Sequence, residues 1–282
     1  YCRLHTPPII AQQSYLNWLE HEDDVLDFAD AKATFLNYLE QIAAFLNLTP
    51  GAKKDEVEVY TCGDLSFLKK LRESNLFSNR EIVQIKKQIL QAESYYIPKL
   101  KLVYLANVSV NHTAEEASHT LKHLLSGDEF PRLRQDAFYA AVLHEALGFF
   151  GSKIINPKRK CSRISDYKNL ISYLRSQDIV KNRLLEYDTA ILFLEHEKKG
   201  AKNELFSQEK IKSFSPDLFF SLLHALGYSL GEKLFYGLLA EIISREEMGE
   251  LFLNPMKNQG QPLQIYLILA RKLRPVRLPR KI

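Results

Sequence analysis

Cysteine is scarce in this chain. Its 282 residues include three cysteines, Cys2, Cys62 and Cys161. Their spacing matches no zinc-binding or redox motif, and an odd number of cysteines argues against a framework of disulfide bonds. The composition therefore predicts a fold held together by its hydrophobic core, in a reducing compartment such as the cytoplasm.

Long apolar runs and nucleotide-binding glycine motifs are also absent from the sequence. No run reaches the roughly 18 apolar residues that a transmembrane helix requires, and no signal peptide is visible. There is no P-loop and no dinucleotide-binding glycine pattern, and no serine or cysteine lies in a recognised nucleophile motif. The chain starts at Tyr1 and not at methionine, as expected of a fragment or a processed product. We expect a soluble protein that lacks the common catalytic motifs.

Positive charge is in excess only locally. The net charge of +4 is too small to indicate nucleic-acid binding by itself. A basic cluster at the end of the chain is the candidate contact if nucleic acid or an acidic partner is bound: Arg271, Lys272, Arg274, Arg277, Arg280 and Lys281. The cluster contains no aromatic residue on which bases could stack. A solvated tail is therefore the favoured interpretation.

Apolar residues recur mainly with the spacing of helices. The pattern predicts shorter helices through residues 9–19, 25–46, 65–71 and 82–89, followed by helices at about 101–126, 131–155, 166–176, 178–199, 216–240, 244–252 and 262–273. The helices at 101–126, 131–155 and 216–240 are the most apolar and should form the centre. The sequence thus predicts a mainly α protein, an irregular multi-helix bundle.

Two short segments are expected to be extended. In residues 56–61, polar and apolar side chains alternate with the period of a strand. Residues 95–98 end in Pro98, and the residue before a proline avoids the helical conformation. They could pair as one small two-stranded β ribbon. The basic segment 158–163 is the predicted boundary between an N-terminal region, 1–157, and a C-terminal region, 158–282, which could also pack as one domain.

Two segments, 141–153 and 221–233, resemble each other without a gap. Leucine, histidine, glycine and lysine recur at the paired positions 143/223, 144/224, 151/231 and 153/233. The helical positions that share a face with each histidine carry small residues: Ala141, Gly148 and Gly151 around His144, and Ser221, Gly227 and Gly231 around His224. The resemblance could reflect an internal duplication or chance.

These two helices allow two interpretations. In the first, they pack on each other through their small faces and the histidines fill the core. We favour this one because buried polar groups usually form hydrogen bonds rather than react. In the second, the small faces form a groove in which His144 and His224, with Glu145, bind a small ligand, a metal or haem iron, or act in acid–base chemistry. Four glycines would line that groove: Gly148, Gly151, Gly227 and Gly231.

A second group of candidates lies on the predicted helix 101–126. His112, Glu116, His119 and His123 are offset by 0, 4, 7 and 11 positions, so they form one stripe. Glu116 and His119 are an ExxH pair, which carboxylate-bridged metal sites in helical bundles use. Glu116, His119 and His123 are therefore candidate metal ligands, although the sequence contains no second ExxH pair.

The stripe also has structural interpretations. It lies about 200° around the helix from the apolar stripe, so a solvated face is favoured. Thr113 and Glu116 would fit a capping box, which would make Glu116 a structural cap. The abundance of histidine is unusual for a solvated face, however. If a metal site forms, His144 or Glu145 could complete it, because a short connection makes the two helices antiparallel neighbours.

Two classes of function follow from these observations. The absence of catalytic motifs favours a non-catalytic helical domain that binds a protein partner or supports a larger assembly. The alternative is a small-ligand, metal or haem site built from the histidines of the central helices. Neither the cofactor nor an enzymatic activity is identified by the sequence alone.

Overall fold

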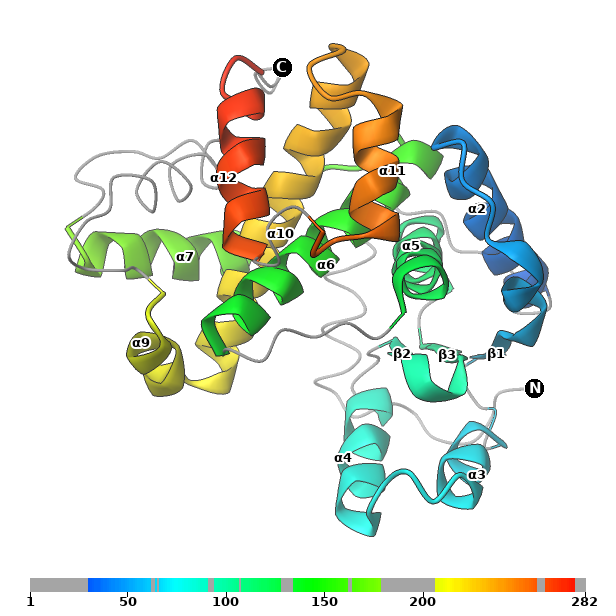
Figure 1. Cartoon of the computed structure of the whole chain (residues 1–282). Coiled ribbons are helices and arrows are strands. Elements are labelled where there is room, and N and C mark those ends of the chain that lie inside the picture. The colour runs from blue at the N-terminus through cyan, green and yellow to red at the C-terminus, as the bar shows by residue number, and fades with distance from the viewer. Residues whose placement is uncertain are drawn as a thin grey trace.

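The computed structural model describes residues 30–61, 64, 66–90, 94–106, 108–127, 134–161, 164–178, 206–257 and 262–276. In these residues the protein is mainly α, as predicted, with ten α-helices, two short 3₁₀-helices and one three-stranded sheet (Figure 1). The predicted helix through 9–19, and all but the first residue of the one at 178–199, lie outside the described residues.

The helices agree best with the prediction in the C-terminal half. The helices predicted at 216–240, 244–252 and 262–273 each agree with the structure to within one residue, whereas α9 was not predicted. The α-helices are α2 (Ala31–Phe45), α3 (Ser66–Glu73), α4 (Asn79–Leu90), α5 (Val110–Ser126), α6 (Arg134–Ile155), α7 (Ile164–Ser176), α9 (Gln208–Ser213), α10 (Pro216–Leu239), α11 (Arg245–Leu253) and α12 (Pro262–Leu273). The 3₁₀-helices are η2 (Gly51–Glu56) and η3 (Pro98–Leu100).

The sheet contains a strand that the helical pattern concealed. The strands β1 (Glu58–Thr61) and β2 (Tyr95–Ile97) lie in the two segments predicted to be extended, but β3 (Leu102–Leu105) separates them. β3 is parallel to β1 and antiparallel to β2. The prediction of a helix from residue 101 was therefore wrong for the described residues before Val110, where α5 begins.

β3 belongs to two hydrophobic cores because successive side chains of a strand point to opposite faces. Leu102 and Tyr104 pack in a small core with α3 and α4, whereas Val103 and Leu105 face the main core. All four residues of β3 are buried. The sheet thus connects the α3–α4 layer to the helical body.

The centre of the main core is formed by α5, α6 and α10. α6 packs against both α5 and α10, and α2 packs along α5 (Figure 1). Leu147 of α6 and Leu230 of α10 are completely buried in the same core. The core therefore contains residues from both sides of the basic segment 158–163, and α5 has helices on two of its faces.

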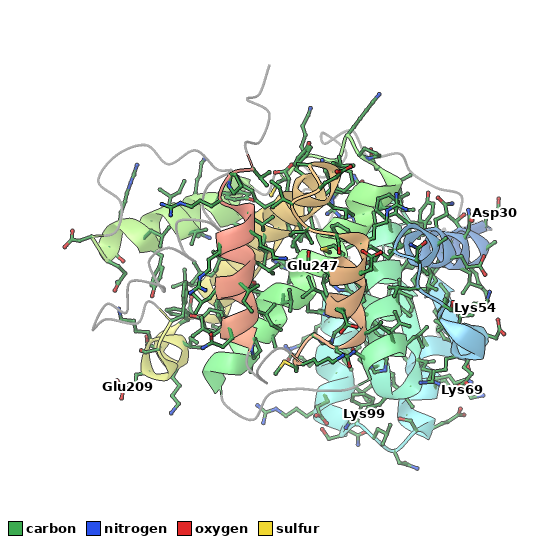
Figure 2. The ribbon with its side chains drawn as sticks, turned by 45° about the horizontal axis from the view of Figure 1, so that its top comes forward. Asp30, Lys54, Lys69, Lys99, Glu209 and Glu247 are labelled. Atoms are coloured by element: carbon green, nitrogen blue, oxygen red, sulfur yellow. The ribbon has the colours of Figure 1, made fainter. Side chains whose placement is uncertain are left out.

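Charged side chains cover the outside of this core. Lys69, Lys99 and Glu209 extend outward from their elements (Figure 2). In the terminal basic cluster, Arg271 and Arg274 are exposed, and Lys272 forms an ion pair with Glu247; the remaining members lie outside the described residues. Among the helices that the structure describes, none is long and apolar enough to cross a membrane.

Candidate metal centre

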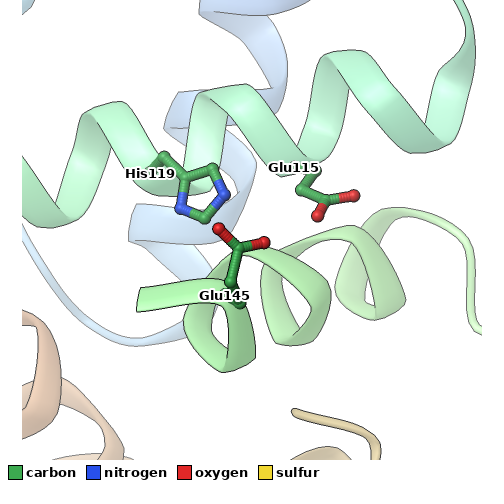
Figure 3. Close-up of side chains that lie close together, drawn as sticks. All are labelled: Glu115, His119 and Glu145. Carbon is green, nitrogen blue, oxygen red and sulfur yellow. The ribbon is translucent and has the colours of Figure 1, made fainter. Parts of the chain in front are cut away.

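Three side chains from two helices converge between α5 and α6. Glu115 and His119 come from α5, and Glu145 comes from α6 (Figure 3). Each offers one ligand atom, and these atoms all lie within 4.8 Å of one another. Glu115 and His119 are buried, and Glu145 is half-buried. This arrangement of one imidazole and two carboxylates is the geometry of a possible metal ion site.

The local sequence explains how α5 presents two of these groups. The Ser109 side chain caps the helix by accepting a hydrogen bond from the backbone amide of His112, which sets where α5 begins. Glu115 and His119 are four residues apart, so they lie one above the other on the same face. That face is turned toward α6 and not toward water.

Gly148 of α6 provides the space that this face requires. A Cβ atom at this position would lie 2.4 Å from Cε1 of His119 and 3.1 Å from Cγ of Glu115. The first distance is shorter than any normal contact between carbon atoms. The absence of a side chain at Gly148 therefore allows His119 and Glu115 to lie against the backbone of α6.

The His119 imidazole is buried and neutral. Its residue is 6% exposed, and burial lowers its pKa to about 4. Its ring stacks on that of His144 at a centroid distance of 3.9 Å, and burial also lowers the pKa of His144 well below the ordinary value. Nδ1 of His119 has no hydrogen-bond partner among the described residues. A buried polar atom without a partner is uncommon and calls for an explanation.

Glu115 is held in its charged form by Arg159. Burial is the largest single influence and opposes ionisation, but Arg159, His112, His119 and Tyr228 together outweigh it and lower the pKa of Glu115 to about 2. Nη2 of Arg159 lies 2.7 Å from Oε2 of Glu115. The guanidinium is enclosed by two aromatic rings, with Phe149 at 4.5 Å and Tyr228 at 5.2 Å. The Tyr228 hydroxyl donates a further hydrogen bond to the Glu115 carboxylate.

Glu145 is contacted from α10 and not from α5 alone. Nε2 of His224 lies 3.8 Å from Oε2 of Glu145. On its other side, Nδ1 of His224 lies 3.9 Å from Oδ2 of Asp166 in α7. The side chains of Glu145, His224 and Asp166 are 17%, 23% and 12% exposed. The site is therefore closed on the side of Arg159 and more open on the side of His224.

Glu116 is next to the cluster and has an unusual protonation state. Burial, together with the negative charges of Glu115 and Glu145, raises its pKa to about 8. It is therefore mostly protonated at neutral pH. It is not a helix cap, because the N-cap of α5 is Ser109 and not Thr113. The capping-box interpretation was wrong.

The structure separates the candidate residues of the α5 stripe. His119 lies beside Glu145, and Glu116 is close enough to feel the charges of Glu115 and Glu145. His123 instead packs edge-to-face on Tyr96, at a centroid distance of 5.5 Å. The expectation that this stripe faces water was wrong for His119, because α6 packs against the side of α5 that carries it.

The two small-residue faces do not meet each other. On α10, a Cβ at Gly227 would lie 2.4 Å from Cβ of Glu145, and one at Gly231 would lie 2.4 Å from the carbonyl oxygen of Ala146. These glycines therefore pack on α6. On α6, Gly148 and Gly151 face α5 instead, with Gly151 against Ser118. The expected pairing of the two faces was wrong, and His144 and His224 consequently have different neighbours.

Glu115 is the member of the cluster that sequence reasoning missed. It lies next to Glu116, which drew attention through its ExxH spacing to His119. The relevant signal was the four-residue spacing between Glu115 and His119, which also places two ligands on one face. That signal is weak without knowledge of which face meets α6.

Comparison with known proteins identifies no relative of this chain. No protein-family model matches it, and neither the curated proteins nor the solved structures contain a significant match. The site is therefore interpreted from its own geometry and chemistry.

Proposed function

We propose that this protein binds one divalent transition-metal ion through Glu115, His119 and Glu145. The observation that carries the proposal is the convergence of three ligand atoms within 4.8 Å of one another at a largely buried place. Metal binding was the alternative function expected from the sequence. We now prefer it to the binding of a protein partner.

The protonation states support metal binding. A metal ligand must offer a lone pair, so imidazole must be neutral and carboxylic acids must be ionised. Burial lowers the pKa of His119 to about 4, while Arg159 keeps Glu115 ionised even though burial opposes this. His119 and Glu115 are thus already deprotonated at neutral pH. A cation would also relieve the proximity of two carboxylates in a medium of low dielectric constant.

The donor set indicates the class of metal. Imidazole nitrogen and carboxylate oxygen together suit Zn²⁺, Mn²⁺ and Fe²⁺, whereas Ca²⁺ and Mg²⁺ prefer oxygen ligands alone. Cu⁺ prefers sulfur, and the site contains no thiolate among the described residues. Three protein ligands would leave at least one coordination position for water, which is typical of sites that act on a substrate.

The proposal is tested by metal titration of the purified full chain. After treatment with a chelator, isothermal titration calorimetry with Zn²⁺ and Mn²⁺ should give one site per chain. His119→Ala should weaken binding at least 100-fold, because an inner ligand is lost. His123→Ala is the matched control: it removes a histidine of the same helix that packs on Tyr96 and should bind as the wild type does. A wild-type chain that binds neither ion, or equal affinities in both variants, would contradict the proposal.

Binding of a protein partner remains a prediction from the sequence. A metal that stabilises the contact between α5 and α6 is compatible with a domain that supports a larger assembly.

A further inference from the structure

His224 and Asp166 form an outer layer around Glu145. The two ring nitrogens of His224 face two different carboxylates: Nε2 faces Glu145 at 3.8 Å, and Nδ1 faces Asp166 at 3.9 Å. The three side chains come from α6, α7 and α10. The imidazole therefore lies between a carboxylate of the metal site and a second carboxylate that does not belong to it, at ion-pair distance from both.

Packing on α10 fixes the place of this imidazole. Gly227, one helical turn after His224, brings the backbone of α10 against Glu145, because a Cβ there would lie 2.4 Å from Cβ of Glu145 and 3.1 Å from the carbonyl oxygen of Val142. The His224 ring lies between those of Phe220 and Tyr228, at centroid distances of 6.5 and 5.8 Å. The close approach of the two helices at Gly227 therefore places the His224 imidazole beside Glu145.

Glu115 also has a nitrogen-bearing partner, at a shorter distance than that between His224 and Glu145. Arg159 contacts its carboxylate at 2.7 Å and is enclosed by aromatic rings. Each carboxylate of the site thus has a nitrogen-bearing side chain beside it, at hydrogen-bond distance for Glu115 and at ion-pair distance for Glu145. In metal sites, such outer partners orient the ligands, and their loss typically lowers metal affinity by about 10- to 100-fold.

We propose that His224, held by Asp166, is a positioning residue that directs the Glu145 carboxylate toward His119 and Glu115 without touching the metal itself. This inference depends on the proposed function, since it assigns a role at the same site. It also explains why a histidine followed by Gly227 occurs on α10: the glycine brings the helix close enough for the imidazole to reach Glu145.

The inference is tested with Co²⁺, whose visible absorption reports the geometry and the nature of the ligands. In the full chain, His224→Ala should lower Co²⁺ affinity by about 10- to 100-fold and alter the absorption bands of the bound ion. His224→Gln should recover part of the affinity, because its amide N–H can take the place of the imidazole Nε2 beside the Glu145 carboxylate. Asp166→Asn should give a smaller loss in the same direction. Leu239→Ala is the control: it shortens an exposed side chain at the far end of α10 and should bind Co²⁺ as the wild type does.

The outcomes separate this inference from the proposed function. If the wild type binds no Co²⁺, the metal site itself is rejected. If the wild type binds and His119→Ala does not, while His224→Ala keeps both wild-type affinity and spectrum, only the positioning role is rejected. If His224→Ala changes the spectrum as the loss of a nitrogen ligand does, His224 is a direct ligand and the proposal is wrong. Should His224→Ala fail to fold, the affinity and spectrum of His224→Gln decide in the same way.

Discussion

Arg159 is the residue on which the buried carboxylate of Glu115 depends. Both side chains are less than one tenth exposed, so little water is available to replace either partner. Removing one member of a buried ion pair leaves the other charged and unpaired, which typically costs about 3–5 kcal/mol. Arg159 therefore stabilises the fold directly, and it supports the proposed metal site by keeping Glu115 ionised.

We expect Arg159→Met to lower the free energy of unfolding of the metal-free protein by about 3–5 kcal/mol. Adding Glu115→Gln should restore part of the loss, because the stranded charge is then removed. Urea denaturation followed by circular dichroism measures both. The matched control is Lys257→Met, which breaks the exposed ion pair with Glu250 and should cost less than about 1 kcal/mol. Equal losses in the two single variants would show that Glu115 does not depend on Arg159.

Residue-level prediction of the site from sequence succeeded in part. His119, Glu116 and Glu145 were identified from spacing and from the expected neighbouring helix, and the structure places them close together. Glu115 and Arg159 were not selected. An ion pair between residues 44 positions apart depends on the tertiary fold, and no local pattern indicates it.

At the level of elements, the contact between α5 and α6 depends on a missing side chain. Gly148 leaves the space that the His119 ring occupies, and that ring is also stacked on His144. An added methyl group could be accommodated only by moving α5 away or by rotating His119. Either change would take His119 away from Glu145.

Gly148→Ala should therefore destabilise the protein by about 1–3 kcal/mol, the usual cost of overpacking, and should weaken Zn²⁺ binding. Thermal unfolding of the metal-free protein and calorimetric titration measure the two effects. Gly249→Ala in α11 is the control, because its nearest neighbour is the mobile end of Leu48 at 3.3 Å. That variant should be neutral or slightly stabilised, since alanine is a better helix former than glycine. A Gly148→Ala protein with wild-type stability and affinity would show that α5 does not need this close approach.

The accuracy of the predicted elements follows from their local signals. Ser215 and Ser244 are the capping residues directly before α10 and α11, and α12 begins at Pro262. These signals are short-range and can be read from the chain. β3 had no such signal, because a short run of buried apolar residues fits a strand or a helix equally well. Only the pairing with β1 and β2 decides between them.

For the whole molecule, the buried histidines make stability depend on pH. The pKa of His119 is lowered by burial to about 4, below its ordinary value of 6.5, so the unfolded chain binds a proton more readily than the folded one. The contribution of neutral His119 to the free energy of unfolding is complete above pH 6.5 and is lost as the pH falls from 6.5 through 4. Glu116 acts in the opposite sense: burial and the charges of Glu115 and Glu145 raise its pKa from 4.5 to about 8, so its contribution to stability is lost as the pH rises from 4.5 through 8.

A comparison with His119→Gln isolates the first effect. Between pH 7 and pH 4, the metal-free wild type should lose about 3 kcal/mol more stability than this variant, since each unit of pKa shift corresponds to about 1.4 kcal/mol. Urea denaturation at a series of pH values gives the difference. Parallel stability curves for the two proteins would show that His119 is not forced to stay neutral in the folded state.

β3 contributes side chains to both hydrophobic cores. Its alternate side chains complete the small core under α3 and α4 and the main core under α5. Separating either core from β3 would expose the buried side chains on one face of the strand. We therefore expect the α3–α4 layer and the helical body to unfold together. Along the chain, α5 begins at Val110, five positions after β3 ends at Leu105. The helix that carries Glu115 and His119 therefore begins next to the strand that joins both cores.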